Sequence, residues 1–260
     1  MTLHTQEFGP ATASTIVFLH GGGVGGWMWK PQIAQLKDEY HLLVPDLPEH
    51  GQSIEVKPLT LRTAAAQVAD LIRTRAHGGR AHVVGLSLGA QTTIELLSQS
   101  PELIDHAVAS GPLMRPLPGI GLTNLMAKLY WPFRNLTWLV KWNMKGLGVP
   151  VEYFEEFRRD TATLTIDGFV RMTLANGNNH VPPNLQAVTV PTLLLVGEKE
   201  LKIMKESVRD LLAAMLSAQG YIVSGAIHNW SLQLPDLFTQ TMRAWITGQA
   251  LPEQLKPLSS

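Results

Sequence analysis

Short apolar runs alternate with amphipathic segments along most of the chain. The runs are rich in Val, Ile and Leu, which is typical of strands buried on both faces. We expect strands at residues 15–19, 41–45, 81–86, 106–110, 189–196 and 221–223. Between them, apolar side chains recur at helical spacing in residues 29–39, 60–77, 89–100, 205–218 and 235–247. The pattern predicts a regular alternation of strands and helices, as in an α/β fold.

The alternation is interrupted between residues 112 and 188. This stretch is helical in short pieces separated by prolines, and it holds nine of the chain's 18 aromatic residues. We predict an inserted helical cap at residues 112–188 on a core domain formed by residues 1–111 and 189–248. The aromatic side chains can line an apolar pocket, pack the cap against the core, or do both. Residues 249–260 are predicted to form a loosely attached C-terminal tail.

The composition restricts the classes of function. Lys and Arg together number 21, as do Asp and Glu, so the formal net charge is zero and no basic stripe suggests nucleic acid or an anionic membrane surface. The chain has no cysteine, which excludes disulfides, thiolate chemistry and cysteine-based metal sites. No apolar run approaches the length of a membrane span, and residues 1–10 lack the pattern of a signal peptide. We expect a cytoplasmic protein without membrane insertion, either a monomer or a homodimer.

Residues 83–90 read Val-Val-Gly-Leu-Ser-Leu-Gly-Ala, an apolar run followed by Gly-x-Ser-x-Gly and a helical pattern. This is the form of a nucleophile elbow, in which a strained turn exposes the middle residue, Ser87, at the start of a helix. Free N–H groups at a helix start favour developing negative charge. An ordinary serine in a glycine-rich turn is the alternative interpretation, and the pentapeptide alone does not decide between them.

A glycine-rich loop follows the first predicted strand. After His20, five glycines fill six positions, so the backbone can approach a ligand closely and point its N–H groups at it. Phosphate binding is one interpretation, but neither Gly-x-x-x-x-Gly-Lys-Ser/Thr nor a clean Rossmann fingerprint is present. The other interpretation is an oxyanion loop of the His-Gly-Gly-Gly kind. The carboxylates and histidines show no metal-binding spacing, so we expect neither a metal nor another cofactor.

The order of these and later motifs resembles that of the α/β-hydrolase family. A strand leads into His20-Gly-Gly-Gly, and residues 45–53 are similar to the family's Pro-Asp-x-Pro-Gly-His-Gly-x-Ser loop. Gly85 to Gly89 fit the elbow. Gly197-x-x-Glu200 and Gly225-x-x-His228 fall where the family places its acid and its histidine.

The resemblance covers about residues 12–247 and has one departure in the second loop, where Glu49 replaces the usual glycine. It implies a mostly parallel central sheet with helices on both faces and an inserted helical cap. In such sheets, ligands bind at the carboxyl ends of the strands. Each of the proposed reactive residues follows an apolar strand, which would place them together at that edge.

The resemblance also implies a role for each reactive residue. Ser87 is predicted to be the nucleophile, His228 the general base and acid, and Glu200 the residue that orients the imidazole. The family more often has Asp as the residue that orients the imidazole. Glu198 lies only two residues away and is the competing candidate.

Main-chain groups complete the predicted site. The oxyanion donors resemble the backbone N–H groups of Gly22 and Leu88. Because these donors are main-chain groups, side-chain identity tests them poorly. His20 and His50 also lie in motif loops, but they resemble positions that the family uses structurally.

These assignments predict a serine hydrolase that cleaves a small-molecule ester with water through a covalent acyl-enzyme. The aromatic cap favours a fairly apolar carboxylic ester, or a lactone or thioester, and we assign five candidate pocket residues: Trp27, Trp131, Trp138, Trp142 and Asn229. Hydrolysis of a carbon–carbon bond in a diketone stays open. A non-catalytic ligand-binding protein on the same fold is a further alternative, against which the complete Ser–acid–His set argues. Epoxide hydrolases and haloalkane dehalogenases of this fold use an Asp nucleophile, which the elbow lacks.

Overall fold

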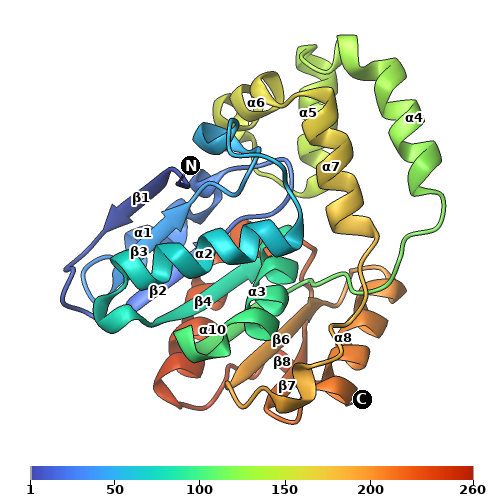
Figure 1. Cartoon of the computed structure of the whole chain (residues 1–260). Helices are drawn as coiled ribbons and strands as arrows, with labels where there is room; N and C mark the ends of the chain where they lie inside the picture. Colours follow the sequence, from blue (N-terminus) through green and yellow to red (C-terminus); the bar gives the residue numbers. More distant parts are fainter. Residues whose placement is uncertain (1, 260) are drawn as a thin grey trace.

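The computed structural model describes residues 2–259 and contains one sheet of eight strands (Figure 1). Their order is β1-β3-β2-β4-β5-β6-β7-β8; β2 to β7 run parallel, whereas β1 and β8 are antiparallel edge strands. The strands are β1 (Thr5–Phe8), β2 (Thr15–Leu19), β3 (His41–Pro45), β4 (Ala81–Leu86), β5 (Ile104–Ser110), β6 (Thr192–Gly197), β7 (Ala218–Val223) and β8 (Leu255–Pro257). The prediction of a mostly parallel central sheet is confirmed.

Helices cover both faces of this sheet. They are α1 (Lys30–Leu36), α2 (Leu61–Arg75), α3 (Leu88–Gln99), α8 (Lys202–Ala214), α9 (Trp230–Gln233) and α10 (Pro235–Thr247). Successive side chains of a strand point to opposite faces. Val17 and Leu19 of β2 therefore belong to the core with α2, α3 and α8, whereas Ile16 and Phe18 belong to the core with α1 and α10. Burial on both faces explains why these strands read as almost continuously apolar.

Four further helices lie between β5 and β6 in the chain. They are α4 (Ile120–Tyr130), α5 (Thr137–Leu147), α6 (Phe154–Thr163) and α7 (Ile166–Gly177). They stand beyond one end of the sheet, with α4 packed on α7 and α5 on α6 (Figure 1). Their side chains share a cavity with Ser87, which follows β4, so this end is the carboxyl end of the parallel strands. We refer to residues 112–188 as the helical insertion. Among residues 2–259, every helix is too short or too polar to span a bilayer.

The C-terminal residues correct the prediction of a loose tail. Leu255–Pro257 form β8 on β7, and Leu258 N donates to Gly220 O at 2.8 Å. Without β8, the outer backbone groups of β7 would be unpaired at a sheet edge. The strand predicted at residues 221–223 is thus longer, Ala218–Val223, and is not the last one. At the other edge, β1 has no counterpart in the sequence prediction, because its side chains are only partly buried.

Candidate active site

Ser87 occupies the turn between β4 and α3. Its φ of 55° and ψ of −115° are rarely adopted by residues other than glycine, so the backbone is strained here. The turn needs its two glycines, because a Cβ at Gly85 would collide with the Gly89 carbonyl and a Cβ at Gly89 with the Leu19 carbonyl. Ser87 N donates to Ser110 O, at the end of β5, at 2.9 Å. The turn thereby holds Ser87 at the wall of a cavity.

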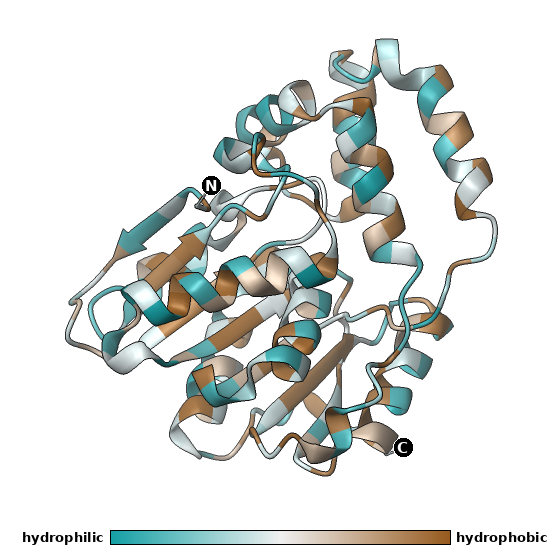
Figure 2. Ribbon diagram, viewed as in Figure 1, coloured by the Kyte–Doolittle hydropathy of each residue, from teal (hydrophilic) through white to brown (hydrophobic). Residues whose placement is uncertain are grey.

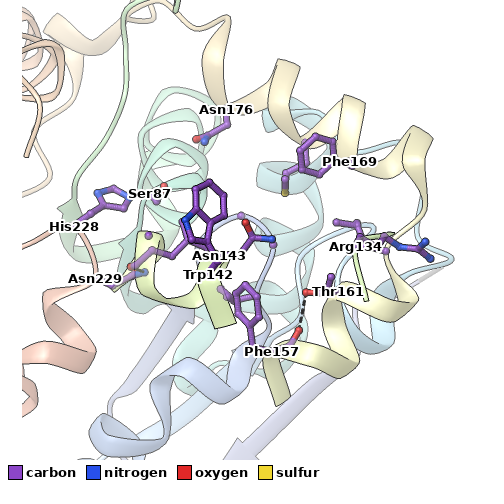
Figure 3. A pocket seen from close by; sticks show the side chains of 18 of the residues that line it. Ser87, Arg134, Trp142, Asn143, Phe157, Thr161, Phe169, Asn176, His228 and Asn229 are labelled. Atoms are coloured by element: carbon purple, nitrogen blue, oxygen red, sulfur yellow. Dashed lines mark hydrogen bonds between the residues drawn. The ribbon is translucent and has the colours of Figure 1, made fainter. Parts of the chain in front are cut away.

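A buried carboxylate orients His228, which lines the same cavity. His228 Nδ1 donates to Glu200 Oε2 at 2.7 Å, and Gly197 N, at the end of β6, donates to Glu200 Oε1 at 2.8 Å. The Glu200 side chain is 2% exposed, whereas that of His228 is 32% exposed. With its proton on Nδ1, the ring keeps a lone pair on Nε2. His228 and Ser87 both line the cavity, as Figure 3 shows.

Glu198, the competing acid, points elsewhere. Its Oε2 accepts a hydrogen bond from Gly225 N at 2.7 Å. This hydrogen bond and the nearby lysines lower the pKa of the Glu198 carboxyl. Of the two candidates, the structure therefore brings Glu200 and not Glu198 to the histidine.

Gly111 is a residue of the site that the sequence interpretation overlooked. It follows β5 with a φ of +61°, and a Cβ there would lie 2.8 Å from His228 Cε1 and 3.2 Å from Glu200 Oε2. The absence of a side chain therefore lets the histidine and the carboxylate lie against the end of β5. The preceding Ser110 is buried and accepts a hydrogen bond from Trp230 Nε1 at 2.8 Å. In the sequence, the pair Gly111-Pro112 after the predicted strand at residues 106–110 was the only local sign of a special turn at this position.

The glycine-rich loop lies against the start of α3. A Cβ built on Gly22 would lie 3.9 Å from the Leu88 Cβ, so the backbones of the two predicted donors are close together. Gly23 N donates to His50 Nε2 at 3.1 Å, and His50 Nδ1 donates to Pro48 O at 2.9 Å. His50 thus fixes the loop by accepting a hydrogen bond, which requires its neutral form.

His20 connects the two motif loops in a similar way. Its Nδ1 donates to Gly21 O at 2.7 Å, and its Nε2 accepts from Leu47 N at 2.8 Å. Burial lowers the pKa of His20, and burial together with the neighbouring His20 lowers the pKa of His50 to about 4. Both rings therefore stay neutral near pH 7 and keep their acceptor nitrogens.

The cavity above Ser87 has a volume of about 440 Å³ and is lined mainly by apolar side chains of the helical insertion (Figure 3). Three of the five candidate pocket residues, Trp131, Trp142 and Asn229, line it. The other two correct the prediction. Trp27 is buried elsewhere, stacked on Tyr153, and Trp138 is 66% exposed on the outer surface. Helical spacing does not tell which side of a helix faces a cavity.

Asn176 adds a polar group to this apolar lining. It belongs to α7 and points toward the Ser87 side of the cavity in Figure 3. Its Oδ1 is buried and has no hydrogen-bond partner within residues 2–259. A buried amide of this kind is costly unless another group completes its hydrogen bonds. Residues 2–259 contain no group of three or more His, Cys, Asp and Glu side chains that could hold a metal ion.

Sequence comparison identifies the family to which this arrangement belongs. The family model described as "Alpha/beta hydrolase family" matches residues 16–241. The chain belongs to the alpha/beta hydrolase family. The resemblance inferred from the motifs is thereby confirmed.

Known members of the family are similar to this alpha/beta hydrolase over almost its whole length. An AB hydrolase superfamily protein of Gibberella zeae is 27% identical over 264 residues, covering 97% of this chain and 86% of that protein. The 3-oxoadipate enol-lactonase 1 of Acinetobacter baylyi is 23% identical, covering 94% and 93%. Among solved structures, a thermophilic esterase from Thermogutta terrifontis has a TM-score of 0.77 at 22% identity, covering 95% of this chain and 93% of the other.

Glu49 marks where this alpha/beta hydrolase departs from the family loop. It has a φ of 61°, a value that suits glycine better. Its side chain is 1% exposed and accepts hydrogen bonds from Arg171 Nε at 2.7 Å, from Arg171 Nη2 at 2.5 Å and from Leu59 N at 3.0 Å. Burial alone would raise the pKa of Glu49, but Arg171 and the Leu59 N–H lower it. The substitution thus creates an ion pair between a core loop and α7 of the helical insertion.

Proposed function

We propose that the protein is a serine hydrolase that cleaves a small, fairly apolar carboxylic ester, lactone or thioester. Ester hydrolysis in general is supported by the relatives, which include an enol-lactonase and an esterase. The observation that carries the finer proposal is the shared cavity, where Ser87 and a carboxylate-bound His228 lie beneath an apolar lining.

The proposed reaction begins with proton transfer from Ser87 Oγ to His228 Nε2. The serine oxygen attacks the ester carbonyl carbon, and the negative charge on the carbonyl oxygen is stabilised by the N–H groups of Gly22 and Leu88. His228 then protonates the leaving alcohol as the bond from the carbonyl carbon to its oxygen breaks. Water, deprotonated by His228, then attacks the carbonyl carbon of the acyl-serine. The resulting tetrahedral intermediate releases the carboxylic acid as His228 returns the proton to Ser87 Oγ. Glu200 remains ionised and stabilises the imidazolium in both steps.

The helical insertion would act as the cap that selects the substrate. It contributes most of the apolar wall, including Trp131, Trp142, Phe157 and Phe169. The core contributes Ser87 and His228. A hydrogen-bonding group on the substrate would satisfy Asn176. The preferred ester is therefore apolar over most of its surface with one neutral polar group.

A fluorophosphonate probe tests the activated serine directly. We expect covalent labelling of wild-type protein, mapped by peptide mass spectrometry to Ser87, and none in S87A. p-Nitrophenyl acetate and butyrate should be hydrolysed by wild type, and S87A should lose at least about three orders of magnitude of kcat. Turnover no faster than S87A on every short-chain ester would refute ester hydrolysis. Turnover of a vinylogous diketone alone would instead support carbon–carbon bond hydrolysis.

A further inference from the structure

Exposed apolar side chains are concentrated on one part of the helical insertion. Of the fourteen large apolar side chains that are exposed within residues 2–259, eleven lie between residues 122 and 151. Leu122, Leu129, Trp138 and Trp142 are each at least 64% exposed. Figure 2 shows apolar residues along α4. We call residues 122–151 the apolar face. A patch of this extent marks an interaction site on a soluble domain.

The helix α4 has its apolar stripe on the solvent side. Leu122, Leu125 and Leu129 are spaced by three and four residues, so they share one face of the helix, and all three are exposed. The residues that α4 buries are Asn124 and Ala127. An ordinary surface helix would bury the leucines. The sequence of α4 is therefore suited to an apolar environment outside the folded chain.

The helix α5 continues this pattern. Trp138 and Trp142 are four residues apart and 66% and 68% exposed, whereas Val140 and Met144 are buried. Two largely exposed tryptophans on one helix are costly in water. Their amphipathic rings are enriched where lipid headgroups meet the acyl chains.

The charged residues of this segment are all basic. Residues 122–151 contain Lys128, Arg134, Lys141 and Lys145 and no Asp or Glu, a formal charge of +4 in a chain whose total is zero. The overall neutrality thus conceals a local segment whose charged residues are all basic. Basic residues interleaved with exposed Trp and Leu are typical of helices that lie in the headgroup region of anionic lipids.

Two partners could cover the apolar face, a second copy of the chain or a lipid surface. A second copy of the chain would pair the apolar face with itself across a twofold axis, which would set like charges against one another. A lipid surface offers both an apolar layer and negative charge. We propose that the apolar face docks on an anionic lipid–water interface.

The apolar face is continuous with the cavity over Ser87. Tyr130, Trp142 and Leu147 are all exposed, and all three also line the cavity. A docked insertion would therefore place the cavity mouth against the lipid. Resting on the proposed function, this geometry names the substrate class: an ester that partitions into lipid and passes to Ser87 without crossing bulk water.

Vesicle binding tests the docking without relying on activity. Full-length protein is sedimented with phosphatidylcholine vesicles and with phosphatidylcholine–phosphatidylserine vesicles, and Trp emission is recorded in both. We expect binding and a blue shift with the anionic vesicles, and binding that weakens as salt is added. S87A should bind like wild type, because docking does not use the serine. Loss of esterase activity with intact vesicle binding would thus refute only the proposed function.

Matched variants locate the binding surface. L129S/W138S and K141E/K145E should each bind anionic vesicles at least about tenfold more weakly than wild type. L216S, a change at a 93% exposed leucine outside the insertion, and K37E, at the residue that follows α1, should bind like wild type. Circular dichroism checks that each variant folds. If L129S/W138S is unfolded, L122S is tested in its place.

Three outcomes would overturn the proposal. They are failure of wild type to bind either vesicle, equal binding to neutral and anionic vesicles, and a concentration-dependent dimer in sedimentation velocity that L129S/W138S abolishes. The last outcome would assign the apolar face to a second copy of the chain.

Discussion

The core and the helical insertion differ in how their side chains are held. In the core, Glu200 is 2% exposed and its two oxygens accept from His228 and Gly197, so the histidine has one well-defined orientation. The insertion instead exposes leucine and tryptophan side chains to solvent. The candidate reactive groups thus lie at the edge of the sheet, whereas most of the cavity wall that would control substrate access belongs to a different part of the chain.

Polar contacts join the two regions near the cavity. Arg171 pairs with Glu49, and Trp27 Nε1 donates to Asp160 Oδ2 at 2.6 Å. Asn229 Nδ2 donates to the carbonyl of Leu147, at the end of α5, at 2.5 Å. Variants at the sheet edge should therefore change the rate, whereas variants at these contacts should change stability and substrate affinity.

The largest effect is expected from Glu200→Gln. A neutral amide no longer stabilises the imidazolium and favours a wrong ring tautomer, so kcat should fall by about three to four orders of magnitude. Glu198→Gln is the matched control, and its kcat should stay within about threefold of wild type because Glu198 binds Gly225 N instead. Steady-state kinetics on p-nitrophenyl butyrate measures both. Equal losses in the two variants would contradict the assignment of Glu200.

Gly111→Ala should impair catalysis through a steric effect on the histidine. The new Cβ would lie 2.8 Å from His228 Cε1 and displace the ring, which should lower kcat by about 100-fold. Gly225→Ala is the control, because its φ of +70° imposes similar backbone strain with no atom within 4 Å of the new Cβ. Both should lose about 1 kcal/mol of unfolding free energy. A kcat loss in Gly225→Ala as large as in Gly111→Ala would attribute the effect to strain alone.

Arg171→Met should test the attachment of the insertion. It leaves the buried Glu49 carboxylate without its cation, and the free energy of unfolding should fall by about 2 kcal/mol, less than for fully buried pairs because Arg171 is 35% exposed. Urea denaturation measures the loss. Adding Glu49→Gly should recover most of it, because glycine suits the φ of 61° and removes the buried charge. Failure of the double variant to recover stability would show that Glu49 acts through other contacts.

Asp160 should make the same interface sensitive to pH, with the smallest effect. Burial raises the pKa of Asp160 from 3.8 to about 6, although the hydrogen bond from Trp27 opposes this. Because the folded-state pKa is raised, the stabilising contribution is complete below pH 3.8 and is lost as pH rises through about 6. Relative to Asp160→Asn, wild type should lose on the order of 1–2 kcal/mol between pH 4 and pH 7. A constant difference in unfolding free energy across this range would contradict the prediction.

Local sequence was sufficient to place most of the core. The strands buried on both faces read as apolar runs, and the elbow glycines were readable because the turn permits no side chain at Gly85 or Gly89. Ser87, Glu200 and His228 could be named because their motifs resemble those of the family and each follows a strand within a few residues, and the carboxyl ends of parallel strands share one edge. Their catalytic roles remain predictions for the experiments above.

The edges of the sheet were not readable in this way. β1 and β8 are short and partly exposed, so they lack an apolar run, and their pairing depends on what the neighbouring strands leave open. The pair Gly111-Pro112 marks the end of a strand, but it does not indicate that His228, more than 100 residues later, will lie against Gly111. Contacts between distant segments are decided by the packing of the whole sheet.

The sequence by itself determined the alternation of strands and helices, the order of the motifs and the place of Ser87 in the elbow turn. These follow from periodicity and from short-range sterics, which act within a few residues. Only the tertiary structure decided between Glu200 and Glu198 as the partner of His228, and between Trp142 at the cavity and Trp27 elsewhere. It also decided that α4 turns its leucines outward. A helical period defines which residues share a face, but the surface that covers that face depends on every other element.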